Sequence, residues 1–577
     1  MTNYGILALW AVCFLLCNLG YWEFFRRNTS IDPSYHPGLT AACQISVLFF
    51  AGILHCLPEA AACLWIAGIG YLLFSLWKDK SLAFLRAYLR PCYLLLAIFA
   101  GVILLRVYDC ILTEYDNFTH WGIVLKTMLA GNRFPDFRDT AITFQAYPLG
   151  SSIYLYFGLC FPGIGMVEWI AMFLQCFLEA TLLIPLCSRI RKNRLAGMLF
   201  LLSAGICFIG NGMRDLRVDI LLAIASSAML LYIQDYCLTE KAGKTQLWLA
   251  SAFLVAVVQL KNSALLFVAM GIVGILWQGK KDGQWKTRIL VCLVPLLSFF
   301  LWRKHFGNVY YSAETSYHAM TLKNYMFTFF NNPISAIPSV AVDVFRFSLT
   351  YVRSWYCLAC LMLATGVTCW QAKQRKPLLK RLLLFAAVFY GCYQLGMLGM
   401  YIFSMGTVES QGLPGSPRYT NAALIVINYM LCSLCLRVLS DLDAKKGKSL
   451  ACICLLVLMY PVRTLAGEER PSLTRPGANV TEARRSIEQL VETYRIPEGK
   501  SYAVLVPEND TAYRTYVLRY VLSTGQAKSV YNADRETLDS LTADYLIILD
   551  SDNPNIQPWI AEHYPDQLGN QVISTSN

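Results

Sequence analysis

The sequence predicts an all-α polytopic membrane protein of about 14 transmembrane helices, followed by a small C-terminal α/β domain. Of its 577 residues, 56% are hydrophobic and only 15% are charged, and the mean hydropathy is +0.45. Soluble proteins carry about 25% charged residues, so much of this surface must face lipid. The net charge is +18 over residues 1–466 and −6 over residues 467–577, which separates two parts and excludes a single soluble domain.

Apolar runs long enough to cross a bilayer, roughly 20 residues each, recur throughout the first part. The first run lacks a basic leading segment and a small-residue cleavage site, so we expect it to be a retained helix. The predicted spans are 4–22, 39–57, 60–77, 91–107, 167–187, 196–212, 217–236, 246–260, 262–278, 289–304, 342–369, 382–404, 419–438 and 449–465.

Alternate loops between these spans concentrate Lys and Arg, as in 189–194 and 373–381. Cytoplasmic loops carry this excess, so we expect a multi-pass plasma-membrane protein with both termini and the C-terminal domain outside the cytoplasm. Residues 147–162 are apolar enough to cross, but a crossing there would place the 189–194 cluster outside. We therefore predict that they lie on the membrane, within a large outer loop from about 108 to 166.

Three regions follow from this layout: N-terminal transmembrane helices (1–90), a membrane core (91–466) and an extracytoplasmic soluble domain (467–577). In the soluble domain, short apolar runs at 501–506 and 543–550 predict buried strands. Helices are expected over about 480–494 and 511–522. The domain has no glycine-rich phosphate loop and no catalytic cluster, so acceptor binding and scaffolding are both open roles for it.

The outer loop 108–166 begins with three acidic residues, Asp109, Glu114 and Asp116. Apolar positions from Phe118 to Met128 recur with helical spacing, and Gly131 can end that helix. Asp116 at the helix start has two interpretations: an N-cap, or a general base placed where a lipid-borne substrate meets water. His120 follows it by four residues and would share its helix face.

Three short motifs in this loop carry a family resemblance: Asp116-Asn117, the stretch from His120-Trp121 to Gly131, and Tyr147-Pro148-Leu149. Together with the helix layout over 91–465, they resemble the membrane-embedded C-type glycosyltransferases (GT-C fold), such as aminoarabinose transferases, protein O-mannosyltransferases and lipopolysaccharide-core glycosyltransferases.

The resemblance implies an inverting enzyme that transfers a sugar from a polyprenyl-phosphate donor to a cell-envelope glycan, lipid or protein acceptor. The catalytic base of the family maps onto Asp116. Many relatives have two acidic residues here, whereas this chain has Asp-Asn, so Asp109 or Glu114 would supply a second carboxylate. A divalent metal ion is a candidate cofactor with unknown ligands. Membrane lipids are expected partners and nucleic acid is not.

A lipid-phosphate leaving group requires positive charge at the outer boundary, because negative charge develops on it as the glycosidic bond breaks. Lys261 interrupts an apolar run at a tight outer hairpin, and Arg418-Tyr419 opens the span after a Gly- and Pro-rich loop. We take Lys261, Arg418 and Tyr419 as candidate phosphate-binding residues. The alternatives are a snorkelling lysine and an interfacial anchor pair.

Two further elements are candidates for the site. Asp215 and Asp219 in the charged loop between the sixth and seventh spans match a second acidic position of the family, although Asp219 could cap a helix and Asp215 could pair with Arg214. The outer loop from about 305 to 341 carries His305 and His318 and is a candidate mobile acceptor-binding element.

Two other functions remain open on the sequence alone. A transporter or lipid flippase would show paired repeats with helices broken at the membrane midplane, and we find no two matching halves. A polysaccharide polymerase or ligase would also use lipid-linked donors, but would place its catalytic loop late in the chain. The early loop that carries Asp116 therefore distinguishes a polymerase or ligase from the proposed transferase.

Overall fold

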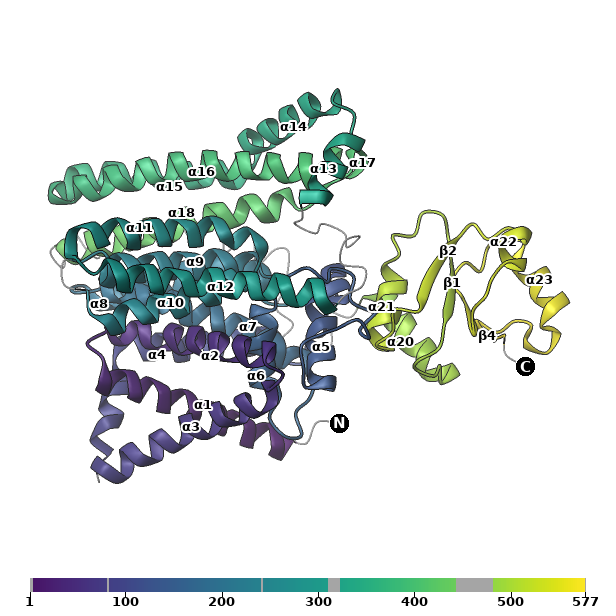
Figure 1. Cartoon of the computed structure of the whole chain (residues 1–577), viewed down its shortest axis with the longest axis horizontal. Coiled ribbons are helices and arrows are strands. Elements are labelled where there is room, and N and C mark those ends of the chain that lie inside the picture. The colour runs from purple at the N-terminus through teal and green to yellow at the C-terminus, as the bar shows by residue number, and fades with distance from the viewer. Residues whose placement is uncertain (1–3, 80–81, 240–241, 310–321, 443–480, 576–577) are drawn as a thin grey trace.

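The computed structural model describes residues 4–79, 82–239, 242–309, 322–442 and 481–575. They form a helical bundle with a small α/β domain at one end (Figure 1). The predicted fold class, an all-α polytopic membrane protein with a C-terminal α/β domain, is confirmed.

Ten helices in the described part of the chain are long and apolar enough to span a membrane, and three shorter apolar helices accompany them. Every predicted span has a helical counterpart except 449–465, which lies outside the described residues. The ten spans, several of which include a flanking helical turn, are Tyr4–Asn28 (α1), Pro33–Ile53 (with α2, His36–Ile53), Leu57–Asp79 (α3), Glu168–Arg189 (with α7, Glu168–Leu183), Asp219–Cys237 (with α9, Asp219–Tyr232), Asn262–Gly279 (with α11, Leu265–Asp282), Trp285–Val309 (α12), Val352–Gln371 (α15), Lys373–Ser404 (with α16, Lys376–Ser404) and Ser416–Asp441 (α18). The shorter three are α4 (Pro91–Val107), α8 (Arg194–Ile209) and α10 (Lys244–Val258).

The predicted span 342–369 is wrong as a single helix. Tyr351 has extended backbone angles (φ −65°, ψ 114°) and separates α14 (Ala336–Thr350) from α15. The preceding loop, predicted over 305–341, is also largely helical in its described part. His305 lies inside α12, and α13 (Leu322–Asn331) precedes α14, while His318 lies outside the described residues.

The apolar segment 147–162 does not span, as predicted, but it does not lie on the membrane surface. It forms α6 (Gly150–Leu159), whose ten residues are all buried against α2, α5 and α7. The Gly150 N–H donates to the Gln259 carbonyl at 2.6 Å, and a Cβ at Gly150 would lie 2.6 Å from that oxygen. The missing side chain therefore lets α6 enter the protein beside the Gln259 turn.

The C-terminal domain is built on a four-stranded sheet in the order β2-β1-β3-β4, in which β1 pairs in parallel with β2 and β3, and β4 is antiparallel to β3. The predicted strands are present as β1 (Tyr502–Val506) and β3 (Tyr545–Ile548), and the predicted helices as α20 (Glu482–Tyr494) and α21 (Tyr513–Val521). The remaining elements were not predicted, because they are short or partly exposed: β2 (Ala527–Tyr531), α22 (Arg535–Asp539), α23 (Ile556–His563) and β4 (Val572–Ser574).

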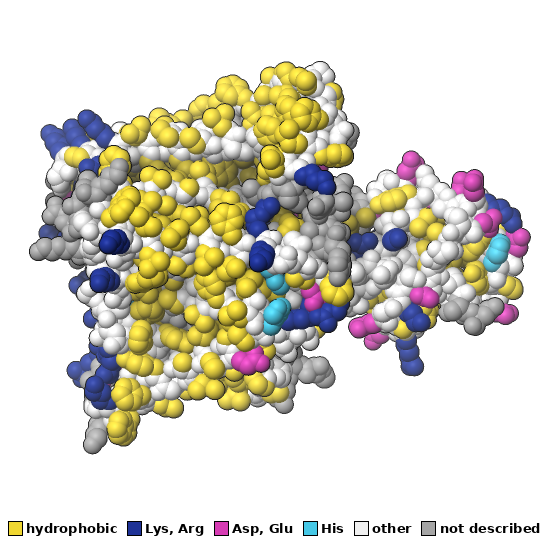
Figure 2. Space-filling view, in the orientation of Figure 1, with side chains coloured by type: hydrophobic (Ala, Val, Ile, Leu, Met, Phe, Trp, Pro, Cys, Tyr) yellow, Lys and Arg dark blue, Asp and Glu magenta, His cyan; other side chains and the backbone are white. Residues whose placement is uncertain are grey.

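Charge is distributed unevenly along the long axis of the molecule. Many of the Lys and Arg side chains gather at the end of the bundle opposite the C-terminal domain, whereas most visible Asp and Glu side chains lie on that domain (Figure 2). This is the distribution that the positive-inside rule requires if the basic end faces the cytoplasm. The side of the membrane on which the domain lies stays a prediction.

Replacing Gly150 with Ala should destabilise the fold, because its Cβ would press on the backbone oxygen of Gln259. We expect a loss of about 1–3 kcal/mol in the free energy of unfolding, as for other overpacked sites. Thermal unfolding of the detergent-solubilised protein measures it. Gly101→Ala in α4 is the matched control, since its Cβ would meet nothing within 4 Å, and an equal loss in both variants would contradict the close approach.

Candidate functional site

The segment around Asp116 is a π-helical turn leading into an α-helix. Asn117–Trp121 is π-helical, closed by a bond from the Gly122 N–H to the Asn117 carbonyl, and α5 (Gly122–Gly131) follows. A Cβ on Gly122 would lie 2.8 Å from that carbonyl oxygen, so glycine permits the wide turn. α5 ends at Gly131, as predicted, with Asn132 in the left-handed conformation (φ 48°). Single π-turns inside helices occur often at functional sites.

Asp116 does not cap this helix. Its side chain makes no capping hydrogen bond; instead its carboxylate accepts a bond from the Arg418 guanidinium at the start of α18. Both side chains are about 30% exposed (28% for Asp116 and 32% for Arg418). The pair joins residues 302 positions apart and leaves the carboxylate accessible from outside the protein.

A second ion pair lies close to the first. Lys261 Nζ donates to Asp219 Oδ1 at 2.6 Å, and it also lies over the Tyr419 ring, 4.6 Å from the ring centre. The Arg418 guanidinium lies 5.7 Å from the centre of the same ring. Lys261 and Arg418, which come from separate helical hairpins, therefore both contact the ring of Tyr419, and each is paired with a carboxylate.

His120, which is buried, and Tyr147, which is partly buried, form the wall beside these pairs. His120 is 1% exposed, packs edge-on against Trp121 and Tyr147, and neither ring nitrogen makes a well-formed hydrogen bond to a described residue. Burial, aided by the charge of Lys261, lowers the pKa of His120 to about 3, so the ring is neutral at physiological pH. Burial likewise raises the pKa of the Tyr147 phenol.

The other acidic candidates lie around Arg217. Its side chain pairs with Glu114 at 3.2 Å and with Asp215. The alternative that Asp215 pairs with Arg214 is therefore wrong. Burial raises the pKa of Asp215, although the charge of Arg217 opposes that shift. Asp109 is exposed at the turn after α4, in the left-handed conformation (φ 56°), and no contact joins it to the two ion pairs within the described chain.

Asn117 has a structural role at the position where relatives carry a second acid. Its side chain is fully buried, and its Oδ1 accepts a bond from the Leu216 N–H at 3.2 Å. It therefore ties the Asp116 segment to the loop before α9. Its neighbour Asp116 points the other way, to Arg418.

A divalent metal does not fit the arrangement of these groups. Among the residues that the structure describes, no three His, Cys, Asp or Glu side chains are grouped so that they could hold a metal ion. Asp116, Asp215 and Asp219 are each paired with a basic side chain, which would compete with a metal ion for the carboxylate.

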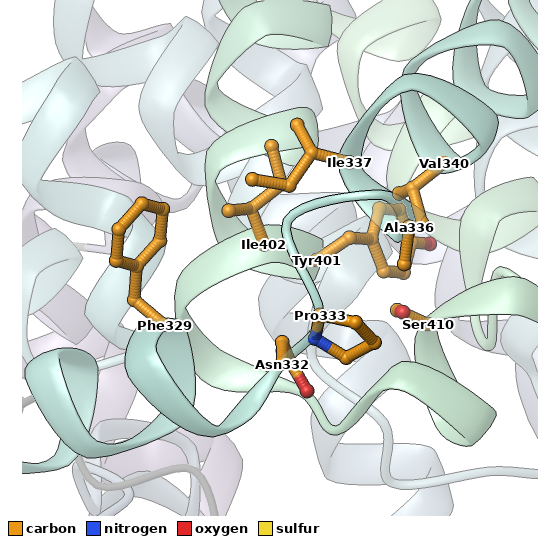
Figure 3. Close-up of a pocket in the computed structure, with 9 residues that line it drawn as sticks. All are labelled: Phe329, Asn332, Pro333, Ala336, Ile337, Val340, Tyr401, Ile402 and Ser410. Atoms are coloured by element: carbon orange, nitrogen blue, oxygen red, sulfur yellow. The ribbon is translucent and has the colours of Figure 1, made fainter.

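A small apolar pocket lies between α13, α14, α16 and α17 (Thr407–Gln411) (Figure 3). Tyr401 lines it and donates its hydroxyl to the Pro414 carbonyl at 3.0 Å, in the loop that leads to Arg418. The lining residues are Phe329, Asn332, Pro333, Ala336, Ile337, Val340, Tyr401, Ile402 and Ser410.

Comparison with known proteins gives one structural similarity. ArnT from Cupriavidus metallidurans, crystallised with undecaprenyl phosphate, matches over 77% of this chain and 87% of its own, with a TM-score of 0.35 and 13% sequence identity. No protein-family model matches the chain, and no curated protein matches it in sequence.

One residue that the sequence analysis did not select proves central to this region. Glu168, the first residue of α7, accepts bonds from the Leu112 N–H, the Arg484 guanidinium and the Tyr520 hydroxyl. Its position at the edge of a predicted span is the signal that could have found it, because a charge at membrane depth usually has a specific partner.

The neutral, buried His120 should make the folded protein sensitive to acid. In the unfolded chain a histidine has a pKa near 6.5, so below that pH the unfolded state binds more protons and stability falls. The loss at pH 5 should be about 2 kcal/mol. His120→Phe keeps the ring contacts and should remove this loss, so thermal unfolding should show a greater advantage of the variant at pH 5 than at pH 8. An equal difference at both pH values would contradict a buried neutral ring.

Proposed function

We propose that the protein is a membrane glycosyltransferase that moves a sugar from a polyprenyl-phosphate donor to a cell-envelope acceptor outside the cytoplasm. The observation that carries the proposal is the meeting of the Asp116–Arg418 and Asp219–Lys261 pairs on the Tyr419 ring. This arrangement provides a base and two cations at one end of the helix bundle, as glycosyl transfer from a lipid phosphate requires.

Asp116 is the proposed general base. The acceptor hydroxyl oxygen attacks the anomeric carbon of the sugar, Asp116 takes the hydroxyl proton, and the bond from the anomeric carbon to the phosphate oxygen breaks. A single displacement of this kind inverts the anomeric configuration. The carboxylate is partly exposed, so an acceptor from the aqueous side can reach it.

Arg418 and Lys261 are the proposed phosphate clamp. The leaving polyprenyl phosphate gains a negative charge, and cations held in place before the reaction stabilise that charge most effectively. Arg418 offers a forked set of donors that suits phosphate oxygens, and Lys261 offers a point charge. In the free protein Asp116 and Asp219 neutralise these cations, which keeps them at the site until the donor arrives.

The apolar surface around the small pocket suits a lipid-borne donor. The pocket lies beside α16 and the Pro414 loop that precedes Arg418, and its lining is mostly aliphatic and aromatic (Figure 3). An isoprenoid chain whose phosphate is held by Arg418 would have apolar surface within reach. A water-soluble nucleotide-sugar donor would have no use for such a surface.

Asp116→Asn should abolish the base and lower sugar transfer by about 100- to 10,000-fold, with donor binding retained. The measurement is transfer of radiolabelled sugar from polyprenyl-phosphate donors to envelope acceptors by protein in liposomes. Asp109→Asn is the matched control: it is exposed in the same loop, asparagine tolerates its left-handed backbone, and its transfer should be unchanged.

Two outcomes of that assay would overturn the proposal. Equal transfer by wild type and Asp116→Asn would remove Asp116 from catalysis. Absence of transfer by wild type from every donor, together with movement of a lipid or solute across the liposome membrane, would favour the transporter alternative. Transfer of a whole preformed glycan chain would favour the ligase alternative.

Arg418→Lys should weaken donor binding about tenfold, because lysine keeps the charge but loses the two-pronged geometry. The donor KM in the same assay measures it. Arg375→Lys is the control, since Arg375 is likewise paired with an aspartate, through two bonds to Asp441, and should leave the donor KM unchanged. An equal rise of KM in both variants would show a general effect of the Arg-to-Lys change.

A further inference from the structure

The C-terminal domain docks on the segment that carries Asp116. Helices α20 and α21 lie nearest to α5 (Figure 1), and Tyr513, Tyr516 and Tyr520 project from α21 onto it. The Tyr513 hydroxyl donates to the Thr113 carbonyl at 2.6 Å. The Tyr516 ring lies 5.0 Å from the Tyr115 ring.

The same helices contact the chain on the other side of Asp116. The rings of Tyr513 and Tyr520 pack on Phe118, with centres 5.7 and 5.2 Å away. Lys126 of α5 donates to the Tyr520 and Val521 carbonyls at 2.7 and 3.0 Å. A lysine from the membrane part thus satisfies carbonyls at the end of α21, where a helix has free acceptors.

Arg484 of α20 lies at the centre of this contact. It is 5% exposed, its guanidinium makes two 2.9 Å bonds to Glu168, and it also donates to the Leu112 carbonyl. It also lies beside both the Phe118 and the Tyr520 ring, 5.7 and 5.6 Å from their centres. This one side chain joins the domain, the start of α7 and both flanks of Asp116.

We propose that α20 and α21 form a clamp that positions Asp116, with Arg484 as the main positioning residue. The clamp holds residues 112–115 before Asp116 and residues 118–126 after it, while Asp116 itself stays free to pair with Arg418. A base must be held close to its working position, because a displacement of about 1 Å can cost a hundredfold in rate. The role of Arg484 in catalysis rests on the proposed function; the clamp itself does not.

The clamp explains why a soluble domain without a catalytic cluster is attached to the membrane core. The π-helical turn at Asn117–Trp121 has a geometry that local propensity does not favour. Its outer face at Phe118 is covered by the domain, and its inner face at Asn117 is tied to Leu216. The domain therefore completes the packing of the turn next to the base.

The test compares Arg484→Ala with wild type in the full-length protein. Hydrogen exchange should become at least about tenfold faster across 112–126 and should be unchanged in the buried membrane helices. In the sugar-transfer assay, kcat should fall about tenfold or more, while the donor KM should stay within about twofold. Arg484→Lys should lose less than Arg484→Ala in both the slow hydrogen exchange over 112–126 and kcat, since lysine can still pair with Glu168.

Two further variants guard against a general loss of folding. Tyr513→Phe removes only the hydroxyl that bonds to Thr113. It should give a smaller increase in hydrogen exchange over 112–126 and a smaller fall in kcat. Arg535→Ala breaks an exposed pair with Glu562 in the same domain and should change neither exchange nor kcat.

The outcomes separate this inference from the proposed function. Unchanged exchange at 112–126 in both Arg484→Ala and Tyr513→Phe would overturn the clamp. Faster exchange with unchanged kcat would overturn the positioning role. A wild type that transfers no sugar would overturn the proposed function and with it the catalytic role of Arg484, while the exchange result still decides whether the clamp exists.

Discussion

Pairing of charges at one end of the helix bundle is the constraint on which the arrangement of this protein depends. A lone charge next to a low-dielectric interior is costly, and it is stable only beside an opposite charge with good geometry. Three such pairs lie here: Asp116–Arg418, Asp219–Lys261 and Glu168–Arg484. Each joins segments far apart in the sequence. Together they hold the Asp116 loop, the Lys261 turn, the start of α18 and the C-terminal domain in one place.

The Asp116–Arg418 and Asp219–Lys261 pairs also supply the chemical groups of the proposed site. In the proposed reaction, a cation that balances a carboxylate in the free protein turns to the phosphate when the charged donor enters, and the carboxylate that it releases is then available to accept a proton. Tyr419 lies under both cations and keeps them close to each other. In the proposed reaction, one exchange of partners therefore prepares both the base and the phosphate clamp.

The sequence predicted the transmembrane spans well where hydrophobicity alone decides them. It predicted them less well where a break in the backbone or a single tertiary contact decides the structure. A break at Tyr351 divides one predicted span, because a single extended residue leaves no mark in a hydropathy average. The helix α6 was expected on the membrane surface but is buried, because its entry depends on the contact between Gly150 and Gln259.

The sequence by itself determined the membrane character of the chain, the α/β nature of its end and the residue types of the site. These follow from composition, from apolar runs and from charges that stand alone in them. Only the tertiary structure decided which charge meets which: Asp116 pairs with Arg418 instead of capping its helix, Asp219 pairs with Lys261, and Arg484 crosses to Glu168. The reason is physical, because an ion pair depends on distances of a few ångströms between helices, and no local pattern in one helix records its neighbour.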